Sequence, residues 1–149
     1  MEDKKKYCYN YPRPAYTVDI AIFNNENILL IKRKHSPFQG LWALPGGFMD
    51  MHETPEDAAT RELQEETGLE IKRLSQFKTF GTINRDPRHR TISTVFYSII
   101  DHHITAPKAG DDAAEAQWWP LEHLPDLAFD HQDIIIQLLD FLGTKKGAN

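Results

Sequence analysis

Cysteine is almost missing from this chain, which has only Cys8 among its 149 residues. A single cysteine excludes a disulfide within the chain and fits a reducing compartment. Long apolar runs are missing too, since no stretch approaches the roughly 18 residues that a membrane-spanning helix needs. The segment Met1–Lys6 is charged and has no apolar run behind it, so we expect no signal peptide. We therefore expect a cytoplasmic protein with no membrane partner.

Basic residues are fewer than acidic residues in this chain. The chain has 17 Lys and Arg against 22 Asp and Glu, a net charge of −5, which argues against general nucleic-acid binding. Neither His-x-x-x-His nor Cys-x-x-Cys occurs, so the spacings typical of zinc sites are absent. A content of 40% hydrophobic and 26% charged residues is that of an ordinary globular protein. We predict one domain over residues 1–149, with an N-terminal extension at 1–11 and a frayed tail at 143–149.

Hydrophobic patterns alternate between the periods of strands and helices. The β-rich runs predict strands at Tyr16–Phe23, Ile28–Lys32, Ile71–Phe80, Thr91–Ile100 and Ala116–Trp119. Helical spacing predicts a C-terminal helix at His131–Leu142, and one helical turn is expected at Leu121–Leu124. Polar segments predict loops at Gly81–Arg90 and His102–Asp112. Strands mixed with packed helices favour an α/β fold in which a mixed sheet lies between helical layers.

Local signals place another short helix at about residues 55–67. Thr54 suits the N-cap, Pro55 the first helical position, and Gly68 the left-handed residue that ends a helix. Because successive helical residues turn by about 100°, three acidic side chains fall on one stripe beside a small apolar face. These side chains are Glu62, Glu65 and Glu66.

Three like charges on one stripe repel each other, and such a cluster persists when a cation lies among them. Carboxylate ligands in this number suit Mg²⁺ or Mn²⁺. A metal would also reverse the local charge for an anionic pyrophosphate and lower the pKa of bound water. Arg61 lies four residues before Glu65, and we expect it to hold that carboxylate in position. Gly46 and Gly47 precede the helix, where glycine lets the backbone approach a ligand closely.

Residues 47–69 carry a spaced motif: Gly, five residues, Glu, seven residues, then Arg-Glu-Leu-x-Glu-Glu-x-Gly-Leu. The motif resembles the Nudix box, found in hydrolases that cleave a nucleoside diphosphate linked to another group. Seven identities and two aliphatic positions match. At roughly 6% per residue type, a chance match has a probability on the order of 10⁻⁸. The alternative is a solvated, charged surface helix. The resemblance implies the Nudix fold, an α/β/α sandwich with a central mixed sheet.

Further segments are similar to ADP-ribose pyrophosphatases linked to NAD turnover, and to repressors of NAD genes that join a Nudix domain to a winged helix. These segments are 12–19, 37–47, 85–90, 110–116 and 127–131. His89 is a departure, since the resemblance leads us to expect a small residue there. Because the box is intact and few residues follow the last helix, we expect an enzyme and not a repressor.

The loop before the strand at 91–100 is basic, with Arg85, Arg88 and Arg90 in an otherwise acidic protein. Arginine forks suit phosphate oxygens, so we predict a clamp on the diphosphate, with a solvated charge run as the alternative. Asp86 is expected to accept hydrogen bonds from ribose hydroxyls. Phe38, flanked by Pro37 and Gln39, is expected to reach an adenine face, and Gly46 to line the substrate site.

The predicted reaction is metal-dependent hydrolysis of ADP-ribose to AMP and ribose 5-phosphate. We expect Gly47, Glu62, Glu65 and Glu66 at the metal, and Arg61 as a support. Three candidates for the base that activates water stay open: Glu65, Glu66 and, because the family often uses a loop glutamate, Glu115. A pyrophosphohydrolase that sanitises oxidised nucleoside triphosphates and a non-catalytic ADP-ribose sensor are alternatives. The aromatic segment around Tyr9 and Tyr11 is typical of interfaces, so we predict a homodimer.

Overall fold

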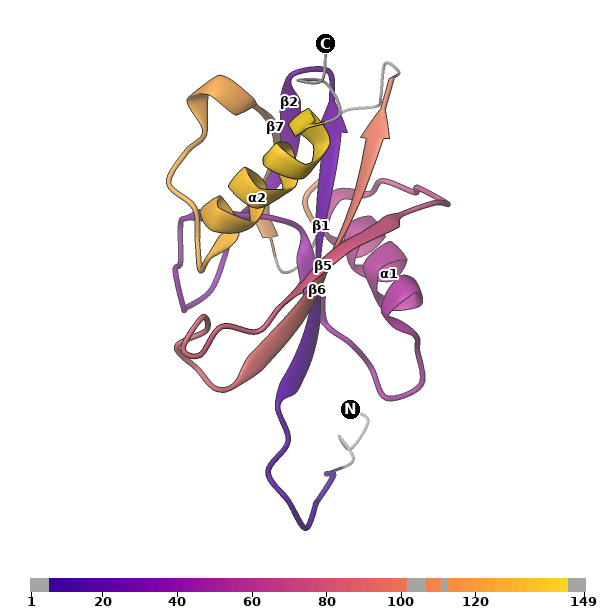
Figure 1. Ribbon diagram of the computed structural model, residues 1–149, viewed down its shortest axis with the longest axis vertical. Coiled ribbons are helices and arrows are strands. Elements are labelled where there is room, and N and C mark those ends of the chain that lie inside the picture. The colour runs from indigo at the N-terminus through magenta and orange to yellow at the C-terminus, as the bar shows by residue number, and fades with distance from the viewer. Residues whose placement is uncertain (1–5, 102–106, 111–112, 145–149) are drawn as a thin grey trace.

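The structure is a computed structural model that describes residues 6–101, 107–110 and 113–144 (Figure 1). Seven strands form one mixed sheet, in which β1 pairs parallel with β6 and antiparallel with β2. The strands are β1 (Ala15–Asn24), β2 (Asn27–Arg33), β3 (Trp42–Ala43), β4 (Gly46–Phe48), β5 (Ser75–Phe80), β6 (Thr91–Ile100) and β7 (Ala113–Pro120). The helices are α1 (Pro55–Thr67) and α2 (His131–Thr144), with a 3₁₀ turn, η1, at Leu121–His123.

The two helices cover opposite faces of the sheet, as Figure 1 shows. Side chains alternate between the faces of a strand, so β1 serves two cores. Ile20 and Ile22 pack with Leu63 of α1, whereas Ala21 and Phe23 pack in the core that includes α2. This layering confirms the predicted α/β/α sandwich with a central mixed sheet.

The sheet forks between β1 and β2, and this fork positions the functional site. The two strands pair only at their hairpin end, through Phe23 with Ile28 and Asn24 with Asn27. Beyond that point β1 pairs with β4 and β2 pairs with β3. The segment 42–48 therefore fills the fork, and it brings the two glycines that precede α1 to the middle of the sheet.

Helix α1 begins and ends as its local signals predict. Thr54 caps the helix by accepting a hydrogen bond from the N–H of Asp57, and the Asp57 carboxylate accepts one from the N–H of Thr54. Gly68 ends the helix with a φ of 76°. Because both signals act within a few residues, they do not depend on the rest of the fold.

Three predicted boundaries are wrong. β5 begins at Ser75 and not at Ile71, because Ile71 and Leu74 pack against the core beside α1. β7 begins at Ala113, so Glu115 lies in a strand paired with β2 and not in a loop. α2 continues through Thr144, so the frayed tail does not begin at 143, and residues 145–149 lie outside the described part of the chain.

The predicted loop His102–Asp112 is described only at 107–110. Two backbone hydrogen bonds attach this short stretch to the end of α1, from Lys108 to Thr67 at 2.9 Å and from Gly110 to Glu66 at 3.2 Å. None of the helices in the described ranges is long and apolar enough to cross a membrane.

Candidate active site

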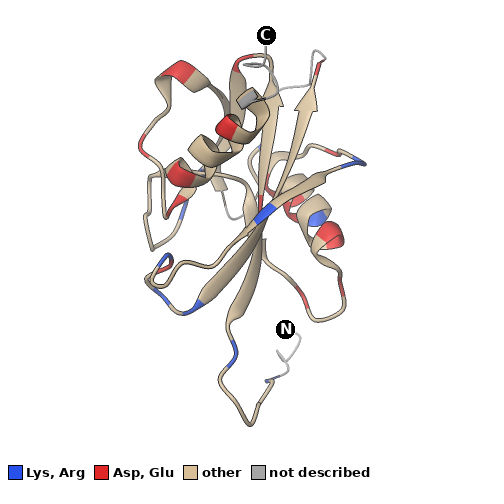
Figure 2. Ribbon diagram, viewed as in Figure 1, with Lys and Arg blue, Asp and Glu red and all other residues tan. Residues whose placement is uncertain are grey.

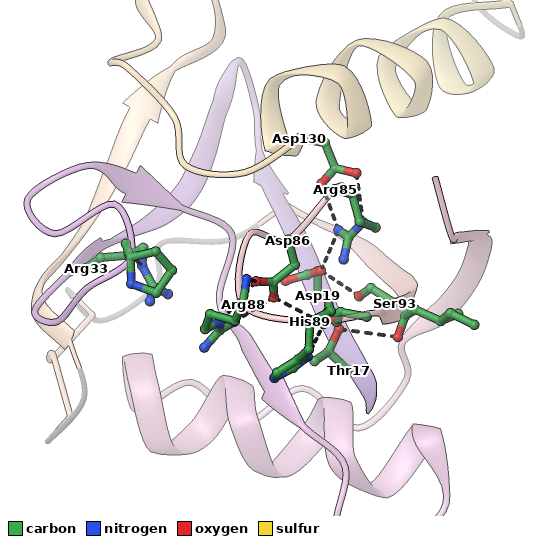
Figure 3. Close-up of polar contacts among 12 residues, drawn as sticks. Thr17, Asp19, Arg33, Arg85, Asp86, Arg88, His89, Ser93 and Asp130 are labelled. Carbon is green, nitrogen blue, oxygen red and sulfur yellow. Dashed lines mark hydrogen bonds and ion pairs between the residues drawn. The ribbon is translucent and has the colours of Figure 1, made fainter. Parts of the chain in front are cut away.

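A cleft lies where β1 and β2 separate. Its walls come from β1, β2, the segment 43–48, α1, the loop before β6 and the start of α2. The polar and glycine residues that line it are Thr17, Asp19, Arg33, Gly46, Gly47, Glu66, Arg85, Asp86, Arg88, Thr91 and His131. Figure 2 shows the basic loop at 85–90 and the acidic residues along α1, and Figure 3 shows the polar contacts among the residues of the cleft.

The acidic stripe of α1 lies directly against the two glycines. Glu66 is 9% exposed, and its Oε2 accepts a hydrogen bond from the N–H of Gly46 at 3.0 Å. A Cβ on Gly47 would collide with the carboxylate of Glu62. Glu65 is the most exposed of the three, with 54% of its side chain accessible. The backbone before the helix thus donates to Glu66 from Gly46, and at Gly47 it approaches Glu62 as closely as only glycine allows.

Arg61 organises this acidic surface. Its guanidinium donates to Glu53 at 2.6 Å, to Glu62 at 3.0 Å and to Glu65 at 3.2 Å. It also donates to the carbonyl oxygen of Phe48 at 3.1 Å. The hydrogen bond from Arg61 lowers the pKa of Glu53. The expected pairing of Arg61 with Glu65 is therefore present, and it is one part of a network that links the helix to the loop before it.

The donor set fits a hard divalent cation. Carboxylates on one helix face, next to a close-packed backbone turn, are ligands of the kind that Mg²⁺ and Mn²⁺ prefer. Among the residues that the structure describes, no three Asp, Glu, His or Cys side chains already have a metal-binding arrangement. The reason is visible in the contacts, since Arg61 holds both Glu62 and Glu65. Binding a cation here would require those two carboxylates to turn from Arg61.

The predicted arginine clamp has a different geometry from the one we expected. Arg85 donates two hydrogen bonds to Asp130, at 2.9 and 2.7 Å, and its side chain is only 4% exposed (Figure 3). Arg88 donates two to Asp86, at 3.0 and 2.8 Å, and its side chain is 36% exposed. Arg90 donates to the carbonyl oxygen of Thr82 at 3.4 Å and is not among the residues that line the cleft.

Asp86 is buried and fully engaged. Burial by itself would raise its pKa, but hydrogen bonds from Arg88 and Thr91 outweigh that effect and lower the pKa of Asp86 to about 2. Thr91 donates from its hydroxyl at 3.2 Å. Asp86 is thus an ionised anchor for Arg88.

A second buried carboxylate, Asp19, lies at the floor of the cleft. It accepts a hydrogen bond from the Ser93 hydroxyl at 2.6 Å, and the guanidinium of Arg85 lies 3.9 Å away. Nε2 of His131 lies 3.5 Å from its other oxygen. Asp19 therefore joins β6, the basic loop and the start of α2 in one polar cluster.

Two phenylalanines beside the cleft adopt left-handed backbone conformations. Phe38 has a φ of 57° and Phe129 a φ of 51°, and their ring centroids are 4.8 Å apart. Such values are strained for bulky side chains and are typical of functional sites. The guanidinium of Arg33 lies 4.9 Å from the Phe129 ring, and that of Arg88 lies 5.5 Å from it. Together these side chains form an aromatic platform flanked by cations.

The cleft brings together half of the residues that the sequence singled out. Gly46, Gly47, Glu66, Arg85, Asp86 and Arg88 line it. Arg61, Glu62, Glu65, Arg90, Phe38 and Glu115 are not among its lining residues. Glu115 pairs with Lys32 at 3.9 Å on β7, and 56% of its side chain is exposed.

Among the residues that line the cleft, sequence reasoning gave no site role to Thr17, Asp19, Arg33, Thr91, Phe129 and His131, although 12–19 and 127–131 are among the segments that resemble ADP-ribose pyrophosphatases. Asp19 had a usable signal, because it is a lone acid within the apolar strand Val18–Phe23. A charged residue at a buried strand position has a partner or a function. Arg33 and Phe129 had no comparable local signal.

Comparisons with known proteins agree on one family. A profile described as NUDIX domain matches residues 13–139. An ADP-ribose pyrophosphatase of Methanocaldococcus jannaschii is 48% identical over 145 residues, which is 97% of this chain and 82% of that protein.

Two solved structures have the same fold. The NUDIX domain of Shewanella oneidensis NrtR complexed with ADP ribose has a TM-score of 0.82 at 30% identity, and the match covers 89% of this chain and 90% of that one. A bifunctional NMN adenylyltransferase/ADP ribose pyrophosphatase from Francisella tularensis, complexed with AMP and a manganese ion, has a TM-score of 0.81 at 34% identity. That match covers 89% of this chain and 43% of that one.

Proposed function

Because the chain belongs to the NUDIX family, we propose that it is a metal-dependent pyrophosphohydrolase that converts ADP-ribose to AMP and ribose 5-phosphate. The relative named as an ADP-ribose pyrophosphatase supports this substrate, and so does the structural likeness to a domain complexed with ADP ribose. The observation that carries the proposal is the intact carboxylate stripe of α1, which lies directly against Gly46 and Gly47 at the wall of the cleft.

The metal is Mg²⁺ or Mn²⁺ in this proposal, held by Glu62, Glu65, Glu66 and Gly47. When bound, it would neutralise the pyrophosphate and lower the pKa of a coordinated water. The protein's own part is to orient these ligands. Arg61 holds Glu62 and Glu65 beside the site, from which they would turn to take up the metal, and the N–H of Gly46 holds Glu66.

For the base that activates water we favour a glutamate of α1. Glu66 lines the cleft, and Glu65 lies one residue before it on the same helix. Glu115, on β7, faces Lys32 on β2 and is not among the residues that line the cleft. Reaching the substrate from there would require the start of β7 to move. Glu115→Gln should therefore stay within a few-fold of the unaltered enzyme.

The diphosphate is recognised, in this proposal, by Arg33 and Arg88. Arg33 lines the cleft. The pKa of Arg33 is lowered, chiefly by burial and secondly by the nearby charge of Arg88. Within the described residues, the one hydrogen bond of its side chain is from Nε to the carbonyl oxygen of Pro37 at 2.7 Å. Its two terminal nitrogens are thus available to phosphate oxygens, which suit the arginine fork. Arg85, tied to Asp130, positions the loop.

The ends of ADP-ribose differ in what they require. The adenine needs an apolar surface to stack on. The rings of Phe38 and Phe129, which are tilted by 60° to one another, offer ring faces of that kind at the edge of the cleft. The terminal ribose needs hydroxyl partners, for which Asp86 stays the prediction, and Gly46 stays a predicted neighbour of the substrate. To accept from a ribose hydroxyl, Asp86 would exchange one of its hydrogen bonds from Arg88 or Thr91. A cytoplasmic location and a role in NAD turnover stay predictions from the sequence.

A matched pair of variants tests the proposed site. Glu66→Gln keeps the shape of the side chain and an oxygen that accepts from Gly46, but it removes the charge. Turnover of ADP-ribose with Mg²⁺ should fall by at least about 10²-fold while the fold survives. Glu70→Gln, an exposed acid just beyond the helix, is the control and should leave turnover unchanged. Full activity of Glu66→Gln, or of the unaltered enzyme in excess chelator, contradicts the assignment.

A further inference from the structure

His131 is a buried histidine whose two ring nitrogens face different partners. Nδ1 accepts a hydrogen bond from the backbone N–H of Leu44 at 3.0 Å, and Nε2 lies 3.5 Å from Oδ1 of Asp19. Because the amide supplies the proton, Nδ1 carries a lone pair, so the ring is the neutral tautomer with its hydrogen on Nε2. Burial lowers the pKa of His131, which favours this neutral form.

The amide that the histidine holds begins a stiff segment, residues 44–46, that ends at the acidic face of α1. Pro45 has a fixed φ and restricts the residue before it. Its carbonyl oxygen accepts from the N–H of Ile20 at 2.8 Å. The N–H of Gly46 then donates to Oε2 of Glu66 at 3.0 Å. The segment is thus held at three successive points, and the last of them is a carboxylate of the proposed metal site.

If one of these three hydrogen bonds is lost, Gly46 has no room to shift and restore its position by itself. A Cβ there would collide with the carbonyl oxygen of Val18 and lie 2.7 Å from Oδ1 of Asp19. The backbone is therefore packed tightly against β1, and its direction is set by how the segment enters from residue 44. That entry is fixed by the pairing of Ala43 with Ile31 on β2 and, at residue 44 itself, by the hydrogen bond from the N–H of Leu44 to His131.

We propose that His131 is a positioning residue for the metal site. By accepting from the amide of Leu44, it fixes the segment 44–46 and so aims the N–H of Gly46 at Glu66. This inference rests on the proposed function, since it takes Glu66 as a metal ligand. Hydrogen-bond partners behind metal ligands typically change metal affinity or activity by about 10–100-fold. The histidine does this as a hydrogen-bond partner of the backbone and not as a ligand of the metal.

Two substitutions at His131 separate the two sides of the ring. His131→Asn places an amide oxygen near the position of Nδ1, so it restores the acceptor for Leu44 but not the contact with Asp19. His131→Gln reaches the position of Nε2, so it restores the contact with Asp19 but not the acceptor. Ser93→Ala is the control, because it removes another buried hydrogen bond to Asp19, which packs against Gly46, but leaves the hydrogen bonds of the segment 44–46 in place.

The measurement is the affinity for Mn²⁺ in the absence of substrate, followed by electron paramagnetic resonance of the free ion. The thermal midpoint of each metal-free protein is recorded alongside. We expect His131→Asn and Ser93→Ala to bind Mn²⁺ within about threefold of the unaltered protein. His131→Gln should bind at least about tenfold more weakly, whatever its thermal midpoint.

The inference would be overturned if the Mn²⁺ affinities of the variants followed their thermal midpoints and did not depend on whether residue 131 has an acceptor for Leu44. A tenfold loss in His131→Asn, or an unchanged affinity in His131→Gln, would also overturn it. If His131→Gln does not fold, His131→Leu takes its place, because it also lacks the acceptor: a loss of at least about tenfold in Mn²⁺ affinity supports the inference, and an unchanged affinity refutes it. An unaltered protein that binds no Mn²⁺ would instead refute the metal site of the proposed function, so the two failures are distinguishable.

Discussion

Arg85 is the residue whose role changes most between sequence and structure. From the sequence it belongs to a phosphate clamp, but in the fold it makes a two-bond ion pair with Asp130 and is almost fully buried. Arg88 keeps a more open position on the cleft wall, with its plane set by Asp86. Arg85 therefore has a structural role and Arg88 a binding role, although they lie only three residues apart.

This division predicts different effects of two substitutions. Arg85→Ala leaves the Asp130 carboxylate without its partner, which should cost about 3 kcal/mol and lower the thermal midpoint by about 10 °C. Arg88→Ala should change the midpoint less but lower kcat/KM for ADP-ribose at least tenfold, since a charge-assisted contact is worth about 1.5–3 kcal/mol. Thermal unfolding and steady-state kinetics check both. Equal midpoints for the two variants would contradict the division.

Asp86 carries a pH dependence of stability. Its pKa in the folded protein is about 2, below the ordinary value of 3.8, because it is ionised beside Arg88. A lowered pKa stabilises the fold fully above about pH 4, and the contribution is lost as the pH falls toward 2. Asp86→Asn should therefore cost roughly 2 kcal/mol at pH 7 and progressively less below pH 4.

Denaturant unfolding from pH 7 down to pH 2.5 measures this difference. Asp126→Asn, at an exposed carboxylate, serves as the control and should show no such convergence. A constant difference between Asp86→Asn and the unaltered protein over this range would show that Asp86 is not the ionised anchor that the structure describes.

At the scale of elements, strand β4 sets how closely the backbone approaches the acidic face of α1. Gly46 packs against backbone atoms of β1, which cannot move cheaply, whereas Gly47 packs against the side chain of Glu62, which can. Gly46→Ala should therefore unfold or strongly destabilise the protein. Gly47→Ala should keep most of its stability but displace Glu62, and so lower Mn²⁺ affinity and turnover. Comparable stability of the two variants would contradict this account.

The sequence predicts those elements best whose signals are local. The bounds of α1 follow from Thr54, Pro55 and Gly68, and all three lie within or next to the helix. The starts of β5 and β7 depend on which partner strand is present, so apolar patterning misplaced both. For β7, the pairing of Glu115 with Lys32 on β2 extends the strand beyond its apolar part.

The site follows the same rule. The stripe of glutamates on α1 and the pairing of Arg61 with Glu65 are predictable, because the residues share one helix. The contacts of Asp19, Arg33 and His131 are not, because they join segments that meet only after the sheet has formed and forked. The loop with Arg85 and Arg88 is only partly predictable. Its positive charge is evident from the sequence, but its ion pairs with Asp130 and Asp86 are not.

At the scale of the whole molecule, the N-terminal residues 6–14 form neither helix nor strand and extend beyond the sheet (Figure 1). Tyr9 is 44% exposed and Tyr11 77% exposed, and the guanidinium of Arg13 lies 3.9 Å from the Tyr9 ring. Exposed tyrosines and arginines of this kind are typical of interfaces. We keep the prediction of a homodimer that uses this segment.

Light scattering at micromolar concentration checks the prediction. The intact chain should show about twice its mass of 17.2 kDa, and removal of residues 1–11 should shift it toward the monomer. A monomeric mass for the intact chain would refute the dimer. Dimerisation that survives the truncation would place the interface elsewhere.

The central claim, that this cleft hydrolyses ADP-ribose, is tested most directly by a substrate panel with Mg²⁺ and chromatographic identification of the products. We expect the protein to form AMP and ribose 5-phosphate from ADP-ribose. Its kcat/KM for ADP-ribose should be higher than for an oxidised deoxynucleoside triphosphate such as 8-oxo-dGTP. A preference for the triphosphate would contradict the substrate assignment, and binding of ADP-ribose without turnover would make the domain a sensor and not an enzyme.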